Sequence, residues 1–539
     1  MNRFPHLNGV VRALLLIVCV CIVSVCFLFL PFPNGSDTQQ RKYSYYRYFS
    51  GSASDVSLAA DELNPDSYAL NLPEISQGHF RRRIQAESAH LPKNASIMKK
   101  RKGYSGGGYV GNLPANTESA ITFPVTVPRT QHYCLTICAA SSETGSHALR
   151  VNDEVISPFT MDDPEHFTMV TFYGIFLEEG EAEISIDTFD TVLDIDYIEL
   201  SDDASVYETD FSIRDSLCNP DASDEARRLY QYLTDNWGKK TLTGQYVSDE
   251  NDRELQLIYQ MTGQLPAIRF SMLDSGDNRD AIDVAIDWNV YMQGIVGLMW
   301  QWNAPGSDSV YAEDSAFDLN GALRHKDMQK LAMLSDAEKA AASGSIRQET
   351  LMLLQDIDHI ADALKPLKTM DIPVLWRPLH EAGGGWYWWG ASGSAAYEKL
   401  WELLYYRMTE YHHLNNLIWL WNGQSAAYLV PERTYDIAAV DIYLQPQMEY
   451  GSRYEQFQAL KKLTGGRKLL ALSECSALPD PEMMQIDRSV WSFFGLWYGD
   501  YLMNPDGTFR DDYYSSNDLY NLYNSELALS LNDFRSTYQ

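Results

Sequence analysis

The chain has 539 residues, of which 73 are acidic and 42 are basic, so its formal net charge at pH 7 is −31. A field of that sign repels nucleic-acid phosphates and anionic lipid headgroups, and we therefore expect no nucleic-acid partner. The apolar share of 45% excludes general disorder, and at roughly 100–200 residues per domain the length predicts two to four domains.

An apolar segment, residues 13–32, follows Arg3 and Arg12 and contains no charged residue. Its length suits the core of a secretory signal peptide or a membrane-spanning helix, and both predict export. No Ala-x-Ala cleavage site follows it, which slightly favours an uncleaved anchor. We therefore expect a secreted or cell-surface protein whose residues 1–32 are a signal peptide or an N-terminal anchor and its only contact with a membrane.

The seven cysteines do not predict a disulfide framework. Three lie in the apolar segment, and the other four are widely scattered. Cys134 and Cys138 lie four residues apart in a β-type run, which places them about 13 Å from each other at strand rise, too far to bridge. We expect buried, unpaired thiols at Cys134, Cys138, Cys218 and Cys475.

The next regions differ in their patterns. Residues 33–79 are rich in Tyr, Ser, Asp and Asn without a sustained period, which predicts a linker. Residues 80–202 consist of short β-type runs separated by turn residues, which predicts an all-β sandwich, and residues 203–218 form a second linker. The clearest β-type runs are residues 120–127, 132–140, 147–151, 169–177, 181–187 and 195–200.

From residue 219 to 539, apolar runs alternate with amphipathic helical segments, the pattern of repeated βα units. Eight such runs favour an α/β fold in which the strands close into a (β/α)8 TIM barrel, with a long insertion at residues 305–344. Reactive groups in such barrels lie where strands end and βα loops begin. The predicted strands are residues 241–245, 266–273, 294–302, 373–381, 417–422, 437–443, 468–474 and 491–497.

Two glutamates end predicted strands directly. Glu381 ends the fourth strand and Glu474 the seventh, each after an apolar run. A buried glutamate is costly unless it is paired or used, so a structural salt bridge is the alternative for each one taken alone. Hydrolysis of a glycosidic bond needs one carboxylic acid and one carboxylate, about 5–5.5 Å apart for retention and about 6.5–9.5 Å for inversion. Together, the two glutamates predict such a pair.

All thirteen tryptophans lie between residues 237 and 497. Three of them, Trp386, Trp388 and Trp389, follow the glycines 383–385, and we interpret this loop as a surface that stacks on sugar rings rather than as core. Other motifs fail on spacing. Position 384 is glycine, so His380 and Glu381 do not begin a zinc-binding helix, and neither a phosphate loop nor a Gly-x-Ser-x-Gly elbow is present in the barrel.

Residues 376–381 (WRPLHE) and 384–390 (GGWYWWG) resemble the acid/base segment of glycoside hydrolase family 26, mostly endo-acting β-mannanases with a (β/α)8 fold. The resemblance spans residues 219 to 539. It implies that Glu381 is the general acid/base and Glu474 the nucleophile of a retaining mechanism, with no cofactor for catalysis. It also implies that Tyr443 hydrogen-bonds the nucleophile and that His380 orients sugar or acid. The further expected substrate-binding residues are Arg377, Trp386, Trp389, Trp497, Trp302 and Gln301.

One position departs from the family pattern, because many members have histidine where this chain has Gln301. That histidine belongs to the sugar site beside the scissile bond, so the preference for mannan over mixed-linkage β-glucan stays open. The alternatives are a β-glucanase, a mannobiose-releasing exo-enzyme of the same family, or a non-catalytic surface glycan-binding protein.

The sandwich has a resemblance of its own. Residues 85–89 (QAESA), 104–110 (YSGGGYV) and 194–200 (DIDYIEL) resemble carbohydrate-binding modules of families 35 and 6. The resemblance implies a structural calcium ion, for which Glu87 and Asp196 are the candidate ligands, while solvated or turn-capping acids are an equal alternative. We expect a monomer whose partner is β-mannan or a related plant polysaccharide.

Overall fold

The computed structural model describes residues 80–538, with gaps at 94, 142–144, 153, 162–165, 190, 204–205, 207–208, 249–250, 342–343 and 447–449. The predicted segments 1–32 and 33–79 lie outside the described residues. Within the described part of the chain, no helix is both long enough and apolar enough to cross a bilayer. The four cysteines of the described part are unpaired, as expected. Cys138 and Cys475 are also buried, whereas Cys134 and Cys218 are only partly buried.

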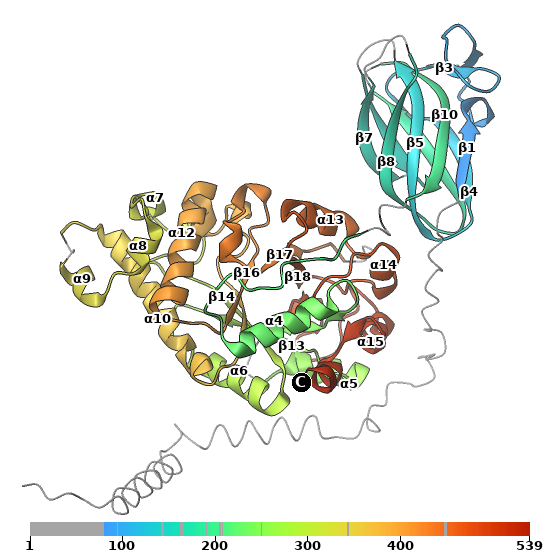
Figure 1. Ribbon diagram of the computed structural model, residues 1–539. Helices are drawn as coiled ribbons and strands as arrows, with labels where there is room; N and C mark the ends of the chain where they lie inside the picture. The colour runs from blue at the N-terminus through green and yellow to red at the C-terminus, as the bar shows by residue number, and fades with distance from the viewer. Residues whose placement is uncertain are drawn as a thin grey trace, which may run out of the picture. The chain divides into compact units, whose positions relative to one another are not determined.

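The N-terminal part is an all-β sandwich, as predicted (Figure 1). One sheet has the strand order β2-β3-β10-β5-β8 with β1 paired to β10, and the other has the order β4-β9-β6-β7. Side chains alternate along the strands: Phe123, Val125 and Val127 are buried, whereas Pro124 and Thr126 are exposed. The strands are β1 (Arg81–Gln85), β2 (Ser96–Met98), β3 (Tyr109–Leu113), β4 (Thr117–Val127), β5 (Gln131–Ser141), β6 (Gly145–Val151), β7 (Glu154–Met161), β8 (Thr168–Leu177), β9 (Gly180–Thr188) and β10 (Leu193–Asp202).

The C-terminal part is a closed barrel of eight parallel strands in chain order, which confirms the (β/α)8 prediction (Figure 1). Gln245 on the first strand pairs with Leu496 on the last and closes the barrel. The strands are nearly continuous apolar runs because helices cover the outer face and side chains fill the interior. They are β12 (Gly244–Tyr246), β13 (Ile268–Leu273), β14 (Ile295–Trp300), β15 (Val374–Arg377), β16 (Leu417–Trp421), β17 (Ile437–Ile442), β18 (Leu469–Cys475) and β19 (Phe494–Leu496).

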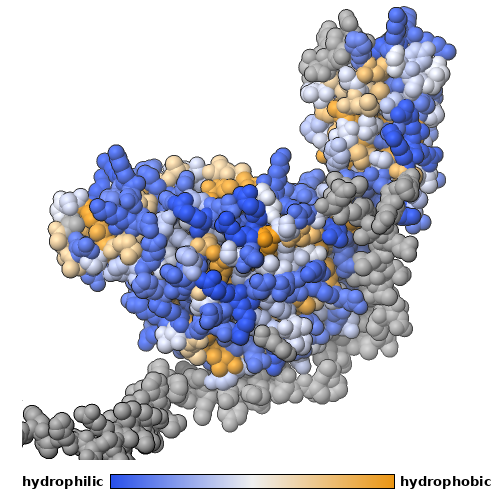
Figure 2. Space-filling model, in the orientation of Figure 1, coloured by the Kyte–Doolittle hydropathy of each residue, from blue (hydrophilic) through white to orange (hydrophobic). Residues whose placement is uncertain are grey.

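Helices surround the barrel, and three short ones lie in the insertion at residues 305–344. The helix at Ser394–Tyr406 continues into a π-helical turn at Arg407–Tyr411. On the face shown in Figure 2, hydrophilic residues cover most of the barrel and hydrophobic residues form scattered patches. The helices are α4 (Asp224–Asn236), α5 (Arg253–Thr262), α6 (Arg279–Met292), α7 (Leu319–Ala322), α8 (Met328–Ala332), α9 (Asp336–Ala341), α10 (Gln348–Thr369), α11 (Trp388–Ala391), α12 (Ser394–Tyr406), α13 (Tyr454–Leu463), α14 (Pro481–Ile486), α15 (Ser516–Asn524) and α16 (Leu531–Thr537).

Two predicted strands have different limits in the structure. The first, predicted at residues 241–245, is divided: β11 (Thr241–Leu242) pairs with β20 (Ala528–Leu529), and only β12 enters the barrel. The fourth, predicted at residues 373–381, ends at Arg377, because Pro378 has no N–H to donate and the next residue has a φ of 51°. Glu381 therefore lies in a turn above the barrel rather than on a strand.

Candidate active site

The turn after β15 fixes the position of Glu381. Leu379 and Glu381 both have a φ of 51°, a left-handed conformation that costs about 1–3 kcal/mol for a residue other than glycine and that clusters at active sites. The backbone N–H of Glu381 donates a hydrogen bond to the carbonyl oxygen of Asn422, 2.7 Å away at the end of β16. This contact ties the turn to the neighbouring strand and directs the Glu381 side chain over the barrel mouth.

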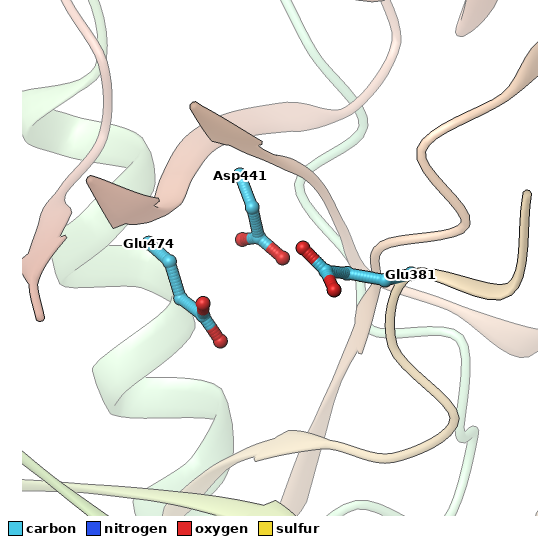
Figure 3. Close-up of side chains that lie close together, drawn as sticks. All are labelled: Glu381, Asp441 and Glu474. Carbon is cyan, nitrogen blue, oxygen red and sulfur yellow. The ribbon is translucent and has the colours of Figure 1, made fainter. Parts of the chain in front are cut away.

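Three carboxyl groups meet there (Figure 3). One oxygen each of Glu381, Asp441 and Glu474 lies within 4.8 Å of the others. Glu474 is on β18 and Asp441 on the adjacent β17, where the two residues are register partners. The structure thus brings together the two predicted glutamates, and it adds an aspartate for which the sequence analysis proposed no role.

Arg377, the last residue of β15, lies beneath this cluster and is 1% exposed. Its Nη1 donates to Glu474 Oε1 at 2.6 Å, and its Nη2 donates to a carboxylate oxygen of Asp441. Ser473 Oγ also donates to Asp441, at 2.6 Å. We expected Arg377 to bind substrate, and this is corrected: its guanidinium is occupied by two carboxylates and has almost no surface for a sugar.

The two glutamates have different polar surroundings. Burial raises the pKa of Glu381, the negative charge of Glu474 raises it further, and the charge of Arg377 opposes both. Glu474 instead accepts one hydrogen bond from Arg377 on Oε1 and another from the Tyr443 hydroxyl on Oε2, at 2.6 Å. Both donors fix the orientation of this carboxylate. The hydrogen bond expected of Tyr443 is present.

His380 lies between the two strained residues and is 2% exposed. Burial lowers its pKa well below the usual value, and the charge of Arg377 lowers it further, so the imidazole is neutral. Its ring contacts the rings of Tyr387 and Trp389, with centroids 4.9 Å and 5.5 Å away. His380 therefore supports the backbone of the turn at residues 378–381, called the acid turn below.

The tryptophan loop divides into an exposed and a buried part. Trp386 is 46% exposed and packs over Gly384, where a Cβ would meet the indole at 2.0 Å. Trp388 is buried, and Trp389 has no exposed surface and donates from Nε1 to the carbonyl oxygen of His380 at 2.8 Å. The stacking role that we expected for Trp388 and Trp389 is therefore corrected to one of support.

Trp388 and Trp389 are buried because two backbone segments approach each other closely at Gly390. A Cβ there would meet the carbonyl oxygen of Ala382 at 2.1 Å, so only glycine lets α11 pack against the acid turn with its indoles inward. The expectation that Trp302 binds substrate is also corrected, because Trp302 is fully buried and its Nε1 donates to Asp356 at 2.9 Å. Trp497 stays partly exposed beside Tyr246, with ring centroids 4.7 Å apart.

Gln301 directly follows β14, and its backbone N–H bonds the carbonyl oxygen of Leu273 at 2.7 Å. Its side-chain Oε1 is buried and has no hydrogen-bond partner among the described residues. A buried carbonyl oxygen without a partner is costly in a folded protein. The amide of Gln301 is therefore a group that a bound ligand could satisfy.

The site contains residues that sequence reasoning missed. Asp441 ends an apolar strand in the same way as Glu474, so the signal was present. Asn422 accepts a hydrogen bond from Arg377 Nη2 at 2.7 Å and continues the polar network beneath the carboxylates. Tyr387 packs in parallel against Trp389, with centroids 4.4 Å apart. Nothing in the sequence distinguished this tyrosine from its tryptophan neighbours.

The sandwich holds a second acidic site. Glu87 Oε1 accepts a hydrogen bond from the Gly107 N–H at 2.8 Å, and both carboxylate oxygens of Asp196 accept from the Ser105 N–H at 2.9 Å. Glu87 Oε2 is buried and has no partner among the described residues. Burial raises the pKa of Asp196, and the nearby charge of Glu87 adds to this. An oxygen-binding cation would relieve both the unpartnered oxygen and the repulsion.

Comparisons with known proteins agree with this architecture. The family model for glycosyl hydrolase family 26 matches residues 218–512, and the model for carbohydrate binding module family 35 matches residues 82–202. A mannan endo-1,4-beta-mannosidase of Thermothelomyces thermophilus is 32% identical over 461 residues, which are 84% of this chain and 90% of that protein. Mannan endo-1,4-beta-mannosidase A of Piromyces sp is 29% identical over 84% of this chain and 72% of its own.

Among solved structures, the GH26-CBM35 beta-(1,4)-mannanase of Podospora anserina superimposes with a TM-score of 0.64 at 29% identity, covering 85% of this chain and 99% of its own. The family match covers more than half of the chain and includes both glutamates of the barrel mouth. This chain therefore belongs to glycosyl hydrolase family 26, and a family 35 carbohydrate-binding module precedes its catalytic domain.

Proposed function

We propose that this protein is a retaining endo-β-1,4-mannanase, in which Glu381 is the general acid/base and Glu474 the nucleophile. The observation that carries the mechanism is the approach of the two carboxyl groups, whose oxygens lie within 4.8 Å. This approach of one oxygen from each group is closer to the separation of about 5–5.5 Å in retaining enzymes than to the separation of about 6.5–9.5 Å in inverting enzymes. The substrate follows from the relatives above, which are named mannan endo-1,4-beta-mannosidases.

The protonation pattern supports these roles. A general acid must be protonated when substrate binds, and both burial and a neighbouring negative charge raise the pKa of Glu381. A nucleophile must be ionised, and Glu474 is held by an arginine and a tyrosine hydroxyl. Glu381 gives its proton to the leaving oxygen while Glu474 attacks the anomeric carbon, and Glu381 then deprotonates the water that releases the sugar.

The first experiment measures turnover and products on mannan, glucomannan and mixed-linkage β-glucan. Release of oligosaccharides of several lengths from mannan supports endo action. Release of mannobiose alone would instead indicate an exo-enzyme, and activity confined to β-glucan would indicate a β-glucanase. The glucan comparison is needed because Gln301 presents an unsatisfied buried amide oxygen after β14. Proton NMR of the first product tests retention, since the β-anomer must appear before mutarotation.

Variants then test the two roles. Glu474→Ala should lower kcat by several orders of magnitude and keep polysaccharide affinity, because the aromatic surfaces are unchanged. Glu381→Ala should lose most activity on mannan but retain much of it on an activated aryl glycoside, whose leaving group needs no proton. Glu455→Ala changes an exposed glutamate on α13 and is the matched control. Polysaccharide binding without hydrolysis by the unmodified protein would instead indicate a non-catalytic glycan-binding protein.

We also propose that Glu87 and Asp196 hold a structural calcium ion in the sandwich, supported by the buried unpartnered Glu87 Oε2. Beside it, Tyr104 is partly exposed and packs against Tyr109, which is buried, with ring centroids 6.0 Å apart. Calcium should raise the melting temperature of the protein and EDTA should lower it. Glu87→Gln should abolish this difference in melting temperature. An unchanged difference in the variant would show that calcium binds at another site.

Finally, we propose that the protein is exported and acts as a monomer on polysaccharide outside the cell. The apolar residues 13–32 support export, and the separate carbohydrate-binding module would raise the local concentration of substrate. N-terminal sequencing of protein recovered from membrane and medium distinguishes an anchor from a cleaved signal. Light scattering of the purified protein tests the monomer.

A further inference from the structure

The segment after β19 forms a fixed hairpin at one side of the barrel mouth. Met503 and Phe509 form an antiparallel bridge, and the Tyr514 hydroxyl donates to the carbonyl oxygen of Tyr501 at 2.9 Å. Arg510 bonds the carbonyl oxygen of Leu502 through its backbone N–H at 3.0 Å. The hairpin therefore holds its side chains in defined positions beside the active site.

Two tyrosines of this hairpin continue outward from the nucleophile. The ring of Tyr443, whose hydroxyl bonds Glu474, lies 5.3 Å from the ring of Tyr501 between centroids. Tyr501 in turn lies 4.9 Å from Tyr513. Tyr501 and Tyr513 are partly exposed, and neither hydroxyl bonds another described residue. They are flat apolar rings with free polar tips, which is the chemistry that binds a pyranose.

Exposed rings also flank the acid on the other side of the mouth. Tyr311, from the insertion after β14, stacks on Tyr387 with centroids 5.7 Å apart and an interplanar angle of 16°. Tyr311 is 47% exposed and Trp386 is 46% exposed. These residues follow the third and fourth barrel strands, whereas the hairpin follows the eighth, so half of the barrel separates the hairpin from the acid turn. A chain passing over both carboxylates has aromatic rings at each end of its path.

We propose that Tyr501 and Tyr513 form a distal sugar-binding platform, which stacks on a unit of the β-1,4-linked polysaccharide on the nucleophile side, beyond the unit that Glu474 attacks. This inference rests on the proposed function and extends it to substrate length. Remote binding energy of this kind raises kcat/KM only for substrates long enough to reach it. The platform thus makes the enzyme prefer long chains over short oligosaccharides.

The test compares substrates of increasing length. Tyr513→Ala should lower kcat/KM about tenfold on mannohexaose and mannan, but less than twofold on the shortest oligosaccharide that is cleaved. Tyr513→Phe keeps the ring and should retain most of the activity on long substrates. Tyr291→Ala removes an exposed tyrosine on α6 and is the matched control. The cleavage positions on mannohexaose should also shift in Tyr513→Ala, because one anchor is lost.

Two results would overturn the platform. An equal loss on substrates of every length would show that Tyr513 acts only through the fold of the hairpin, and no loss on any length would show that it binds no sugar. Calorimetry with mannohexaose in a Glu474→Ala background gives a second readout, in which adding Tyr513→Ala should weaken binding about tenfold. This measurement needs no hydrolysis. If the proposed activity itself fails, the same comparison runs on whichever β-1,4-linked hexasaccharide binds.

Discussion

Replacing Tyr443 with phenylalanine removes one oxygen atom and, with it, one of the two hydrogen bonds that hold the nucleophile. The Tyr443 hydroxyl donates to Glu474 Oε2 at 2.6 Å, and Arg377 holds the other oxygen, Oε1, at the same distance. A hydrogen bond to an ionised group contributes about 1.5–3 kcal/mol. At 1.36 kcal/mol per tenfold, Tyr443→Phe should lower kcat/KM by about 10- to 150-fold on mannan oligosaccharides.

The loss should appear chiefly in kcat, because the hydrogen bond orients the attacking carboxylate and the phenyl ring keeps its contact with Tyr501. Steady-state kinetics on one oligosaccharide, together with a thermal melt, measures both effects. Tyr450→Phe is the matched control, since that buried hydroxyl donates to the carbonyl oxygen of Ile442 at 3.2 Å rather than to a carboxylate. A folded Tyr443→Phe enzyme with a kcat within twofold of the parent would refute the reasoning.

Two further predictions concern pH and stability. Burial is the main influence on the pKa of Glu381 and raises it, whereas the Trp386 side chain is one of the groups that lower it. Trp386→Phe should therefore raise that pKa further and move the alkaline limb of the kcat/KM profile to higher pH; an unmoved limb would contradict this. Asp358 pairs with the fully buried Arg407, so Asp358→Ala should lower the free energy of unfolding by about 3–5 kcal/mol, measured by urea unfolding. Asp362 is exposed, so Asp362→Ala should change that free energy little. Burial raises the pKa of Asp358, but hydrogen bonds to the surrounding cations outweigh this and lower the pKa overall. The contribution of Asp358 to the free energy of unfolding is therefore present above the ordinary carboxyl pKa range and should be lost as the pH falls below that range. Urea unfolding at several pH values measures this loss.

The approach of the two glutamates that we propose as catalytic could be predicted from sequence because two independent signals coincide. The βα alternation indicates where strands end, and parallel strands in a closed barrel bring those ends to one mouth. Glu381 follows β15, and Glu474 lies near the end of β18. Asp441 gives the same signal on β17. It was missed because a buried acid in a strand is also what a structural salt bridge produces, and Asp441 does pair with Arg377.

The tryptophans show what sequence cannot supply. Three indoles in four residues indicate an aromatic loop, but the direction of each ring depends on backbone contacts between segments. The contact that decides it is between Gly390 and the Ala382 carbonyl oxygen, where no Cβ fits. That approach turns Trp388 and Trp389 inward and leaves Trp386 on the surface. A glycine in a Trp-Trp-Gly run does not by itself indicate which backbone it will meet.

One arginine accounts for the division of labour between two chemically identical glutamates. Glu381, Asp441 and Glu474 present three carboxyl groups in one small volume, where three negative charges would repel strongly. Arg377 forms ion pairs with Asp441 and Glu474, and its interaction with Glu381 is only through space. Of the two glutamates only Glu474 forms an ion pair with Arg377, while burial and the charge of Glu474 raise the pKa of Glu381. Burial also raises the pKa of Asp441 well above its usual value, and the charge of Arg377 opposes that increase. The proposed acid and the proposed nucleophile thus differ in their surroundings because of where β15 ends, since its last residue is the arginine and Glu381 follows four residues later in the adjoining turn.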